Sequence, residues 1–531
     1  MYDMLIRRAT IIDGTGEPRW EGDVGVKDGY FTAIKPTIEP KNAKQTIEGK
    51  GLVLAPGFID IHTHSDDYWL QDPLSEIKLR QGVTMEVVGN CGTSLAPLLT
   101  QSKKLALSEA LIAQENHNAF KDDFSFADYR ELIEEKHLAI NLIGLIGHGT
   151  LRIAVMGFSD KDPDARQMEQ MKKLLGSALD QGARGMSTGL IYAPGIFAKT
   201  QELVELSHVI AEREGLYTSH MRNEAEEVLA AIDEVITIGE QAQVAVHISH
   251  LKITGQRNWG LADQVIDKIQ TARAKGIDLT CDVYPYFSSR TSLTALIPPW
   301  AIEGGVGKLT LRLQDATQKV KIIHDIKQGI LGWENMYHNA GWEKITISQV
   351  HSIEYKDVEG QTVAEIARKR KINPFELILE LIEKDGNSVK IISETMNEET
   401  VAQFIKQPFA MIGSDSGFSQ GKPHPRLYGA FPRVIRRFVR ELNVLSLEEA
   451  IHKMSGMTAQ RLKLKDTGLI KKGLRADAVL FDPETFRDTA TYQDPCRFPE
   501  GLRMVIVNGV VVIDGSDHTG ATPGVFRGEQ V

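Results

Sequence analysis

GFIDIHTH, residues 57–64, predicts a short apolar β-strand that ends in two histidines. Side chains alternate along a strand, so His62 and His64 point to the same side and could share one metal ion. The same pattern also arises where two polar residues simply end a strand without binding a metal. Further candidate ligands at the ends of other strands would favour the metal site.

Seven more apolar runs follow this strand, and helical stretches separate them. The alternation of strand and helix predicts an α/β fold with parallel strands, and eight strands fit a (β/α)8 TIM barrel. Each run ends in polar or metal-binding residues, and the active sites of such barrels lie at the C-terminal ends of the strands. We expect the eight strands at FIDIH (58–62), MEVVG (85–89), INLIGLIG (140–147), GMSTG (185–189), LYTSH (216–220), VHISH (246–250), LTCDVYPY (279–286) and AMIGSD (410–415).

The two ends of the chain differ from this middle part. Residues 1–56 and 465–531 contain short β-like runs separated by glycine and aspartate turns, with few helical patterns. They predict one small β-sandwich domain built from both termini, around a catalytic barrel at residues 57–464. Between the seventh and eighth strands, an insertion at about residues 287–400 is expected to cover part of the site mouth like a lid.

Composition limits the class of partner. The chain has 531 residues, 42% of them hydrophobic and 25% charged, and a formal net charge of −10. No apolar run approaches the ~20 residues that span a bilayer, and the acidic balance disfavours nucleic acid as a partner. The start lacks the pattern of a secretory signal, so a cytoplasmic location is expected. We therefore expect a small-molecule substrate, whereas the oligomeric state stays open.

Three more strand ends carry residues that bind metals, namely Cys91 in VVGNCGTS, His220 in LYTSH and His250 in VHISH. Zinc favours imidazole and thiolate ligands. A single strand-end cysteine is more often a small buried apolar residue than a ligand, and Cys281 and Cys496 are too scattered for a disulfide framework. The combination of one cysteine with the strand-end histidines nevertheless indicates a metal site.

Two other histidines are less informative. His148 lies between glycines in LIGHG, where it could line the site or mark a turn. His247 is out of phase with an inward-pointing His250, so we assign it to packing.

Asp415 closes the eighth strand in AMIGSDSG. A carboxylate at this place would stand over the metal and could act as a general base toward a bound water. Aspartate is also common in turns and as a helix N-cap. The apolar run before it and the other strand-end residues favour the catalytic interpretation.

Longer motifs add a resemblance that runs through nearly the whole chain. VVGNCGTS, GLIYAPG, TSHMRNE, HISHLK, DVYPY, GSDSG and GLIKKGLRADAVLFDP, together with GFIDIHTH, resemble the D-aminoacylase (N-acyl-D-amino-acid deacylase) family of the amidohydrolase superfamily. The resemblance implies zinc-dependent hydrolysis of the amide bond of N-acyl-D-amino acids, which releases a carboxylic acid and a D-amino acid. Cys91 is its most specific element, since many relatives in the superfamily bridge two metals with a carboxylated lysine.

The resemblance also implies roles for single residues. The positions matching Cys91, His220 and His250 hold a tight Zn²⁺, and those matching His62 and His64 contribute to a weaker second metal site. Asp415 matches the acid/base. The expected contacts of the substrate are Lys252, Arg426 and Tyr192 at the carboxylate and Tyr284 in the lining of the site. This chain departs from the pattern at Arg290, where relatives tend to carry a small hydroxyl residue.

Alternatives stay open at this level. The barrel could act on a cyclic amide or ureide, or bind a metal without turnover, although Cys91 favours deacylation and Asp415 favours catalysis. The preferred side chain is equally open, because the apolar segment ALIPPWAIEGG (295–305) suggests a pocket for apolar amino acids, whereas Arg290 could favour an acidic one.

Overall fold

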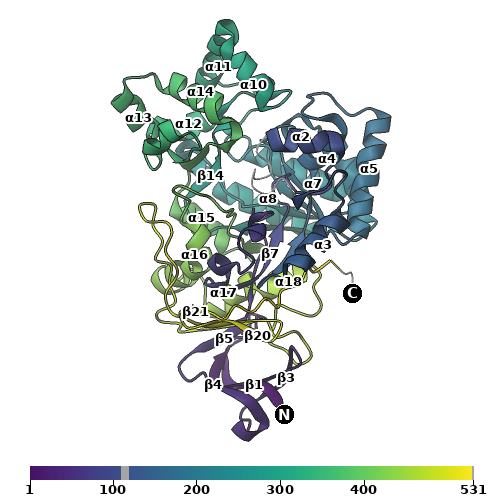
Figure 1. The fold of residues 1–531 in the computed structure, drawn as a ribbon, viewed down its shortest axis with the longest axis vertical. Coiled ribbons are helices and arrows are strands. Elements are labelled where there is room, and N and C mark those ends of the chain that lie inside the picture. The colour runs from purple at the N-terminus through teal and green to yellow at the C-terminus, as the bar shows by residue number, and fades with distance from the viewer. Residues whose placement is uncertain (109–118, 529–531) are drawn as a thin grey trace.

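The structure, a computed structural model, describes residues 1–108 and 119–528 of the chain (Figure 1). Its centre is a set of parallel strands that follow one another around a closed barrel. In chain order they are β6 (Phe58–Asp60), β7 (Val83–Val88), β8 (Asn141–Gly144) with its short continuation β9 (Ile146–Gly147), β10 (Gly185–Gly189), β11 (Leu216–His220), β12 (Ala245–Ile248), β13 (Leu279–Val283) and β17 (Ala410–Ile412).

Hydrogen bonds close these strands into one barrel although they form two sheets. One sheet runs β6-β7-β8 and the other runs β17-β13-β12-β11-β10-β9. Leu145 connects β8 to β9, and beside it the Arg184 amide donates to the Gly144 carbonyl at 2.9 Å. On the other side the Asp415 amide donates to the carbonyl of His62 at 2.8 Å. The predicted (β/α)8 barrel is therefore confirmed.

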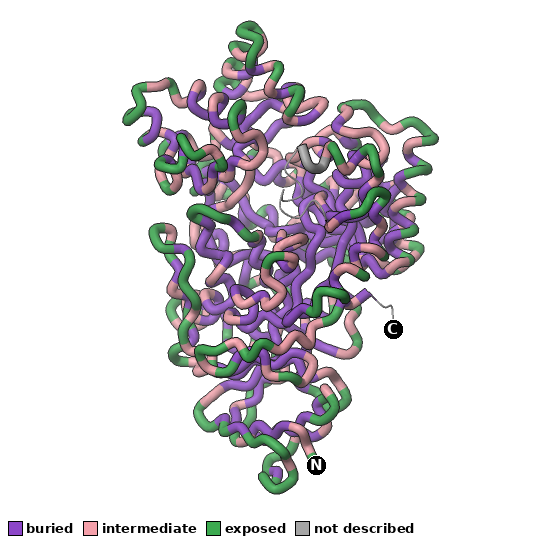
Figure 2. The backbone as a smooth tube through the Cα atoms, viewed as in Figure 1, coloured by how far each residue is buried: buried purple, intermediate pink, exposed green. Residues whose placement is uncertain are grey.

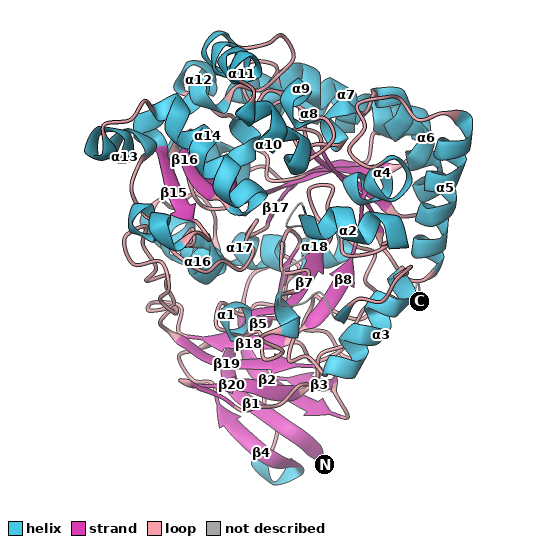
Figure 3. Cartoon of the chain, turned by 45° about the horizontal axis from the view of Figure 1, so that its top comes forward, coloured by secondary structure: helices cyan, strands magenta, loops and turns pink. Residues whose placement is uncertain are grey.

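Helices surround the barrel strands (Figure 3). Their bounds are α1 (Glu76–Leu79), α2 (Thr100–Ser108), α3 (Phe126–Lys136), α4 (His148–Met156), α5 (Ala165–Asp180), α6 (Thr200–Ala211), α7 (Val228–Ala242), α8 (Ala262–Ala274), α15 (Glu398–Ile405), α16 (Arg426–Arg433), α17 (Leu447–Met454) and α18 (Gly456–Arg461). None of the helices in the described part of the chain is long and apolar enough to cross a membrane.

Helix α5 shows how local sequence produces this layer. Asp164 caps its first turn by accepting from the Gln167 amide at 2.8 Å, and the Gln167 side chain accepts from the Asp164 amide at 2.9 Å. Such a capping box satisfies amides that have no partner within the helix. Met171, Leu175 and Leu179 then recur at helical spacing and are buried against the barrel.

The insertion between β13 and β17 folds around a core of its own and lies at the top of Figure 1. It contains an antiparallel sheet in the order β14-β16-β15. Leu296, Ile297 and Ala301 of the apolar segment ALIPPWAIEGG are buried in this core. The elements are β14 (Ser288–Ser292), α9 (Pro299–Ile302), α10 (Val306–Gln314), α11 (Ala316–Gln328), α12 (Met336–Ala340), β15 (Ile345–Gln349), α13 (Val363–Arg370), α14 (Pro374–Asp385) and β16 (Lys390–Glu394).

Both ends of the chain contribute strands to one β-domain, at the bottom of Figure 1. Its sheet runs β21-β20-β19-β18-β5-β1-β2-β3, and β4 pairs with β1 beside this path. The first half of β1 pairs with β4 and its last two residues pair with β5, so the sheet divides at β1. The strands are β1 (Tyr2–Ile11), β2 (Trp20–Lys27), β3 (Tyr30–Lys35), β4 (Ala43–Glu48), β5 (Val53–Pro56), β18 (Ala478–Phe481), β19 (Leu502–Val507), β20 (Val510–Asp514) and β21 (Asp517–His518).

A cluster of buried residues from both termini, including Ile6, Leu54, Ala478 and Ile506, fills this domain. Figure 2 shows buried stretches of chain in this domain and in the barrel above it. After β21 the chain leaves the sheet and returns to the barrel, where the Gly524 amide donates to the Leu138 carbonyl at 2.7 Å. The two chain ends therefore anchor the barrel from below, opposite to the inserted segment.

Candidate metal centre

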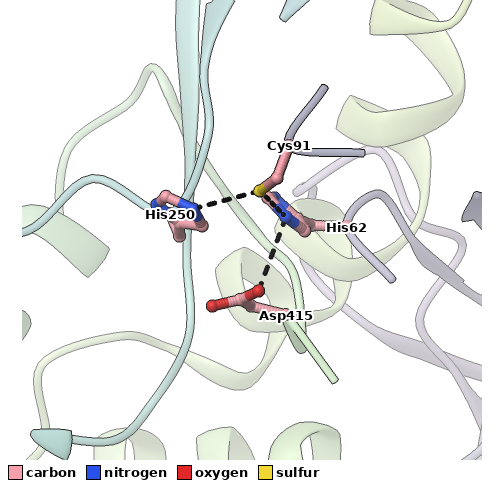
Figure 4. Close-up of side chains that lie close together, drawn as sticks. All are labelled: His62, Cys91, His250 and Asp415. Carbon is pink, nitrogen blue, oxygen red and sulfur yellow. Dashed lines mark hydrogen bonds and ion pairs between the residues drawn. The ribbon is translucent and has the colours of Figure 1, made fainter. Parts of the chain in front are cut away.

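Five candidate residues come together at the C-terminal ends of the barrel strands. His62, Cys91, His250 and Asp415 follow β6, β7, β12 and β17, and their side chains converge in Figure 4. Cys91 Sγ lies 3.3 Å from His62 Nε2 and 3.4 Å from His250 Nε2. His62 Nε2 lies 3.5 Å from Asp415 Oδ1. His220, the last residue of β11, adds its Nδ1 at 3.0 Å from His250 Nε2.

His64 lies at the edge of this group. Its Nε2 is 3.2 Å from Asp415 Oδ1, and its side chain is 34% exposed, whereas that of His62 is fully buried. The two histidines of GFIDIHTH therefore both face Asp415, His62 from inside the site and His64 from its rim.

The backbone is strained at three of these positions. Cys91, His250 and Asp415 have φ angles of 50°, 38° and 49°. A left-handed conformation costs a non-glycine residue on the order of 1–3 kcal/mol, and such strain tends to occur at functional sites. Here it turns each side chain into the barrel just after its strand has ended.

Charge interactions shift the pKa values of these side chains, and for His62 and His250 nearby negative charge raises the pKa although burial would lower it. Burial alone would raise the pKa of Cys91, but positive charge on His62 and His250 lowers it well below its usual range. Burial would also raise the pKa of Asp415, which Arg426 and His250 lower well below its usual range. Burial lowers the pKa of His220, so this imidazole stays neutral. A thiolate and a neutral imidazole are the forms that bind a metal.

Asp282, near the end of β13, holds the histidines in place, and sequence reasoning missed it. Its Oδ2 lies 3.3 Å from His62 Nδ1 and 3.0 Å from His247 Nε2, and its Oδ1 accepts from the His250 amide at 3.0 Å. His247 also lies 2.8 Å from Thr280 Oγ1, so it supports the site through Asp282. A carboxylate at the end of a barrel strand was the signal that could have found Asp282.

Glu224 is the second residue that sequence reasoning missed. It lies four residues after His220, with Oε2 at 3.7 Å from His220 Nε2 and Oε1 at 3.1 Å from His250 Nδ1. Lys252 Nζ donates to Glu224 Oε1 at 2.7 Å. Although burial would raise it, the charge of Lys252 lowers the pKa of Glu224 to about 2.

The expected substrate contacts surround the same centre. Arg426 Nη1 lies 2.8 Å from Asp415 Oδ2, and its guanidinium stacks 4.7 Å from the centre of the Tyr284 ring. Lys252 Nζ lies 5.6 Å from the same ring centre. The ring of Tyr192 meets the His220 ring edge-on at 5.1 Å, and its hydroxyl lies 2.9 Å from Thr291 Oγ1 of β14.

His148, the ambiguous histidine, belongs to a different buried group. Its Nε2 lies 2.7 Å from Glu202, which also pairs with Arg152. Helix α4 begins at His148, and its Thr150 amide donates to the Gly92 carbonyl at 3.2 Å, directly after Cys91. The first turn of α4 therefore supports the loop that carries Cys91 through this hydrogen bond.

The residues at the centre fit a zinc ion. Zinc prefers four ligands in a tetrahedron with bonds of about 2.0–2.3 Å, which puts ligand atoms roughly 3.3–3.8 Å apart. The donor atoms of His62, Cys91, His250 and Asp415 all lie within 4.8 Å of one another, and so do those of His220, Glu224 and His250. His220 Nε2 is buried and has no hydrogen-bond partner among the residues that the structure describes.

Comparison with known proteins agrees with this geometry. The profile of the amidohydrolase family matches residues 45–513. D-aminoacylase of Alcaligenes xylosoxydans xylosoxydans is 33% identical over 523 residues, which cover 98% of this chain and 97% of that protein.

Two solved structures are similar over the full length. One is a D-aminoacylase whose binuclear centre shows one-metal activation and second-metal attenuation, with a TM-score of 0.83, 31% identity and 100% of both chains covered. The other is N-acyl-D-glutamate deacylase from Bordetella bronchiseptica, complexed with zinc and a phosphonate that mimics the tetrahedral intermediate, with a TM-score of 0.82, 32% identity and coverage of 99% of this chain and 100% of that chain. This chain therefore belongs to the amidohydrolase family, and within it to the D-aminoacylases.

Proposed function

We propose that this protein is a zinc-dependent N-acyl-D-amino-acid deacylase that hydrolyses the linear amide bond and releases a carboxylic acid and a D-amino acid. The convergence of Cys91, His220 and His250 beside Asp415 carries the proposal, since these side chains offer donor atoms suited to zinc next to a carboxylate in one buried site. Full-length similarity to a D-aminoacylase supports the choice of substrate.

Cys91, His220 and His250 are proposed to hold the tight zinc ion. His62, His64 and Asp415 are proposed to form the weaker second site, which their contacts of 3.2 and 3.5 Å to Asp415 Oδ1 support. When bound, zinc polarises the amide carbonyl and lowers the pKa of water.

Asp415 is proposed to move the proton. Its carboxylate stays ionised because the charge of Arg426 opposes the effect of burial on its pKa. It can therefore accept a proton from the attacking water and donate it to the departing amine. Burial of the site excludes bulk water, which strengthens each of these charge interactions.

Arg426 is proposed to bind the α-carboxylate of the substrate, with help from Tyr192, Tyr284 and Lys252. Its Nε is buried and has no hydrogen-bond partner among the described residues. The ammonium of Lys252 is already close to Glu224, so we assign the larger share of this binding to Arg426. The two cations face the same Tyr284 ring, which supports the proposal that both approach one substrate carboxylate.

Removal of the substrate carboxylate tests this clamp. Converting N-acetyl-D-methionine to its primary amide should lower kcat/KM about tenfold to more than a hundredfold, because charge-assisted hydrogen bonds contribute roughly 1.5–3 kcal/mol each. The same conversion should matter much less in a Lys252→Met, Arg426→Met double variant, whose cations are gone. Steady-state kinetics of the four combinations decide the matter. An equally large penalty in the double variant would mean that other residues bind the carboxylate.

Asp282 should influence metal affinity without touching the metal. Asp282→Asn should weaken zinc binding by about 10- to 100-fold, because residues that orient ligating histidines commonly have this effect. Competition with a chelator measures the affinity. Asp278→Asn is the matched control, since Asp278 precedes the same strand but its side chain is 64% exposed and pairs with Arg461. A zinc affinity that both variants share with the parent would remove Asp282 from this role.

A panel of N-acetyl-D- and N-acetyl-L-amino acids tests the function as a whole. The zinc-loaded protein should release amine from D substrates and not from their L counterparts. Hydantoins and dihydropyrimidines belong in the same assay, because ring opening is the alternative reaction. If the protein opens these rings but leaves every acyl-D-amino acid intact, the proposal is wrong.

A further inference from the structure

A cluster of buried charges lies beside the loop that carries Asp415, and the proposed mechanism does not involve it. Its members are Asp60 of β6, Lys78 of α1 and Glu86 of β7, whose side chains are at most 4% exposed. Lys78 Nζ donates to Asp60 Oδ2 at 2.8 Å and lies 3.1 Å from Glu86 Oε1. A buried charge is unfavourable unless it is paired and hydrogen-bonded, so the three groups depend on one another.

Lys78 also binds the two residues on either side of Asp415. Its Nζ donates to Ser414 Oγ at 3.0 Å and to Ser416 Oγ at 2.9 Å. The two hydroxyl oxygens lie 2.8 Å apart. The Ser414 amide, in turn, donates to Asp60 Oδ1 at 2.8 Å. One ammonium group therefore connects both neighbours of Asp415 to the first strand of the barrel.

Asp415 needs support of this kind because its strand has already ended. Strand β17 ends at Ile412, and Asp415 has a φ angle of 49°. Such a left-handed backbone is unfavourable for a residue other than glycine and persists only where the surrounding structure imposes it. The Asp415 amide donates to the His62 carbonyl at 2.8 Å, and the two fixed serines hold the chain on either side of this bond.

The same cluster also holds the loop that follows β6. Ser65, the residue after His64, donates from its hydroxyl to Glu86 Oε1 at 2.9 Å, and this is the oxygen that faces Lys78. The His64 amide donates to the Ser416 carbonyl at 2.8 Å. The cluster therefore fixes the loops after β6 and β17 relative to each other, which sets where their side chains meet in the site.

Lys78 stays charged in these surroundings. Burial would lower its pKa, but the charges of Asp60 and Glu86 raise it above its usual range. An ammonium group carries only donors and can bind several oxygens at once. A methionine in its place would fill a similar volume but would leave the carboxylates and the two serine hydroxyls without this donor.

We propose that Lys78 is a positioning residue for the proton transfer at Asp415. Its ammonium fixes Ser414 and Ser416, and through them the direction in which the Asp415 carboxylate faces the scissile amide. Lys78 acts through these two serines and not on the substrate itself. The inference rests on the proposed function, in which Asp415 moves the proton.

Replacement of Lys78 tests this role in the zinc-loaded, full-length protein. Lys78→Met should lower kcat for an N-acetyl-D-amino acid by about tenfold to a hundredfold, because a small displacement of a reacting group can cost a factor of this size. KM and the content of tight zinc should stay near those of the parent, since the residues proposed to bind substrate and zinc are unchanged. Steady-state kinetics and metal analysis measure these quantities.

A double-mutant cycle with Asp415→Asn distinguishes positioning from a general structural role. If Lys78 acts through Asp415, Lys78→Met should lower the rate in the parent but have little effect in the Asp415→Asn background, where the positioned group can no longer accept a proton. Single-turnover experiments measure the low rates. Destabilisation alone would lower the rate by the same factor in both backgrounds.

A second variant covers the case in which Lys78→Met does not fold, since that substitution leaves two buried carboxylates without a counter-charge. The double variant Ser414→Ala, Ser416→Ala removes both hydroxyls and keeps the ion pairs of Lys78. It should reproduce the fall in kcat, and in the cycle its effect should again require Asp415.

Lys453→Met is the matched control. Lys453 is also a buried lysine, and its Nζ donates to the Ala410 carbonyl at 2.9 Å. Ala410 is the first residue of β17, at the end of the strand that lies away from Asp415. This variant loses a buried ammonium on the same strand, and its kcat should stay near that of the parent.

Each outcome bears on the proposal. A fall in kcat that requires Asp415 supports it. An unchanged kcat in Lys78→Met or in the serine variant, or an equal fall in both backgrounds, overturns the positioning role and leaves the deacylase function intact. A loss that appears in KM or in zinc content would place Lys78 in substrate or metal binding, which also overturns it. If the parent hydrolyses no acyl-D-amino acid at all, the proposed function fails and this inference fails with it.

Discussion

Cys91→Ala should lose its tightly bound zinc and its activity together. In the proposed site this thiolate is the one sulfur ligand among the described residues, and two buried imidazoles alone hold zinc less well than two imidazoles with a thiolate. The loss of zinc affinity should exceed the roughly 10- to 100-fold that follows when a residue behind the ligands is changed. Metal analysis of the purified variant and amine release from an N-acetyl-D-amino acid measure the two effects.

Cys281→Ala is the matched control for this experiment. Cys281 is also a buried cysteine, but it lies within β13, and burial raises its pKa to a value at which the thiol stays protonated. Its alanine variant should keep a full complement of zinc. A Cys91→Ala variant with normal zinc content and normal turnover would remove Cys91 from the metal centre.

The barrel could be predicted from sequence because each strand is short, apolar and followed by polar residues. The strand ends were less predictable. AMIGSD was expected to be extended as far as Asp415, but β17 ends at Ile412. VHISH was expected to reach His250, but β12 ends at Ile248. The left-handed backbone of His250 and Asp415 explains both differences. Such a backbone is usually signalled in a sequence by a glycine, and neither position is a glycine.

The same effect limits arguments from alternation along a strand. Lys252 was placed on the side of His250 because the two residues are two positions apart, but both lie past the end of β12. Lys252 is near the site because its ammonium binds Glu224, from the loop after β11. Contacts of this kind depend on how separate loops meet, which a single sequence does not reveal.

Residues that reach the site from the inserted segment were the hardest to interpret. Arg290 was left open because its position depends on β14 pairing with β16, about 100 residues later in the chain. The apolar residues near it suggested a binding pocket, whereas they fill a separate core. Cys91, His220, His250 and Asp415 were found more easily, since barrel topology alone brings strand ends together. The domain boundaries at residues 56 and 465 stay a prediction.

Asp415→Asn should keep the tight zinc ion while kcat falls by about 10²- to 10⁴-fold, the usual contribution of general acid–base catalysis. The substitution keeps the shape of the side chain but removes its ability to accept a proton from water. Cys91, His220 and His250 are unchanged, so metal analysis should find one zinc ion per chain. Single-turnover kinetics with an N-acetyl-D-amino acid separate the chemical step from substrate binding.

Asp488→Asn controls for the loss of a buried carboxylate that pairs with arginine. Asp488 is buried and pairs with Arg433 and Arg436, outside the group of side chains that surrounds Cys91. Its variant tests whether breaking such a pair lowers kcat by destabilising the protein, and we expect its kcat to stay near that of the parent.

If Asp415→Asn also turned over within a fewfold of the parent, the proton would have to move through another group. His64, whose Nε2 lies 3.2 Å from Asp415 and whose pKa rises to about 9, would then be the nearest candidate. A large loss in Asp415→Asn with zinc retained separates proton transfer from metal binding, because loss of a ligand would remove both.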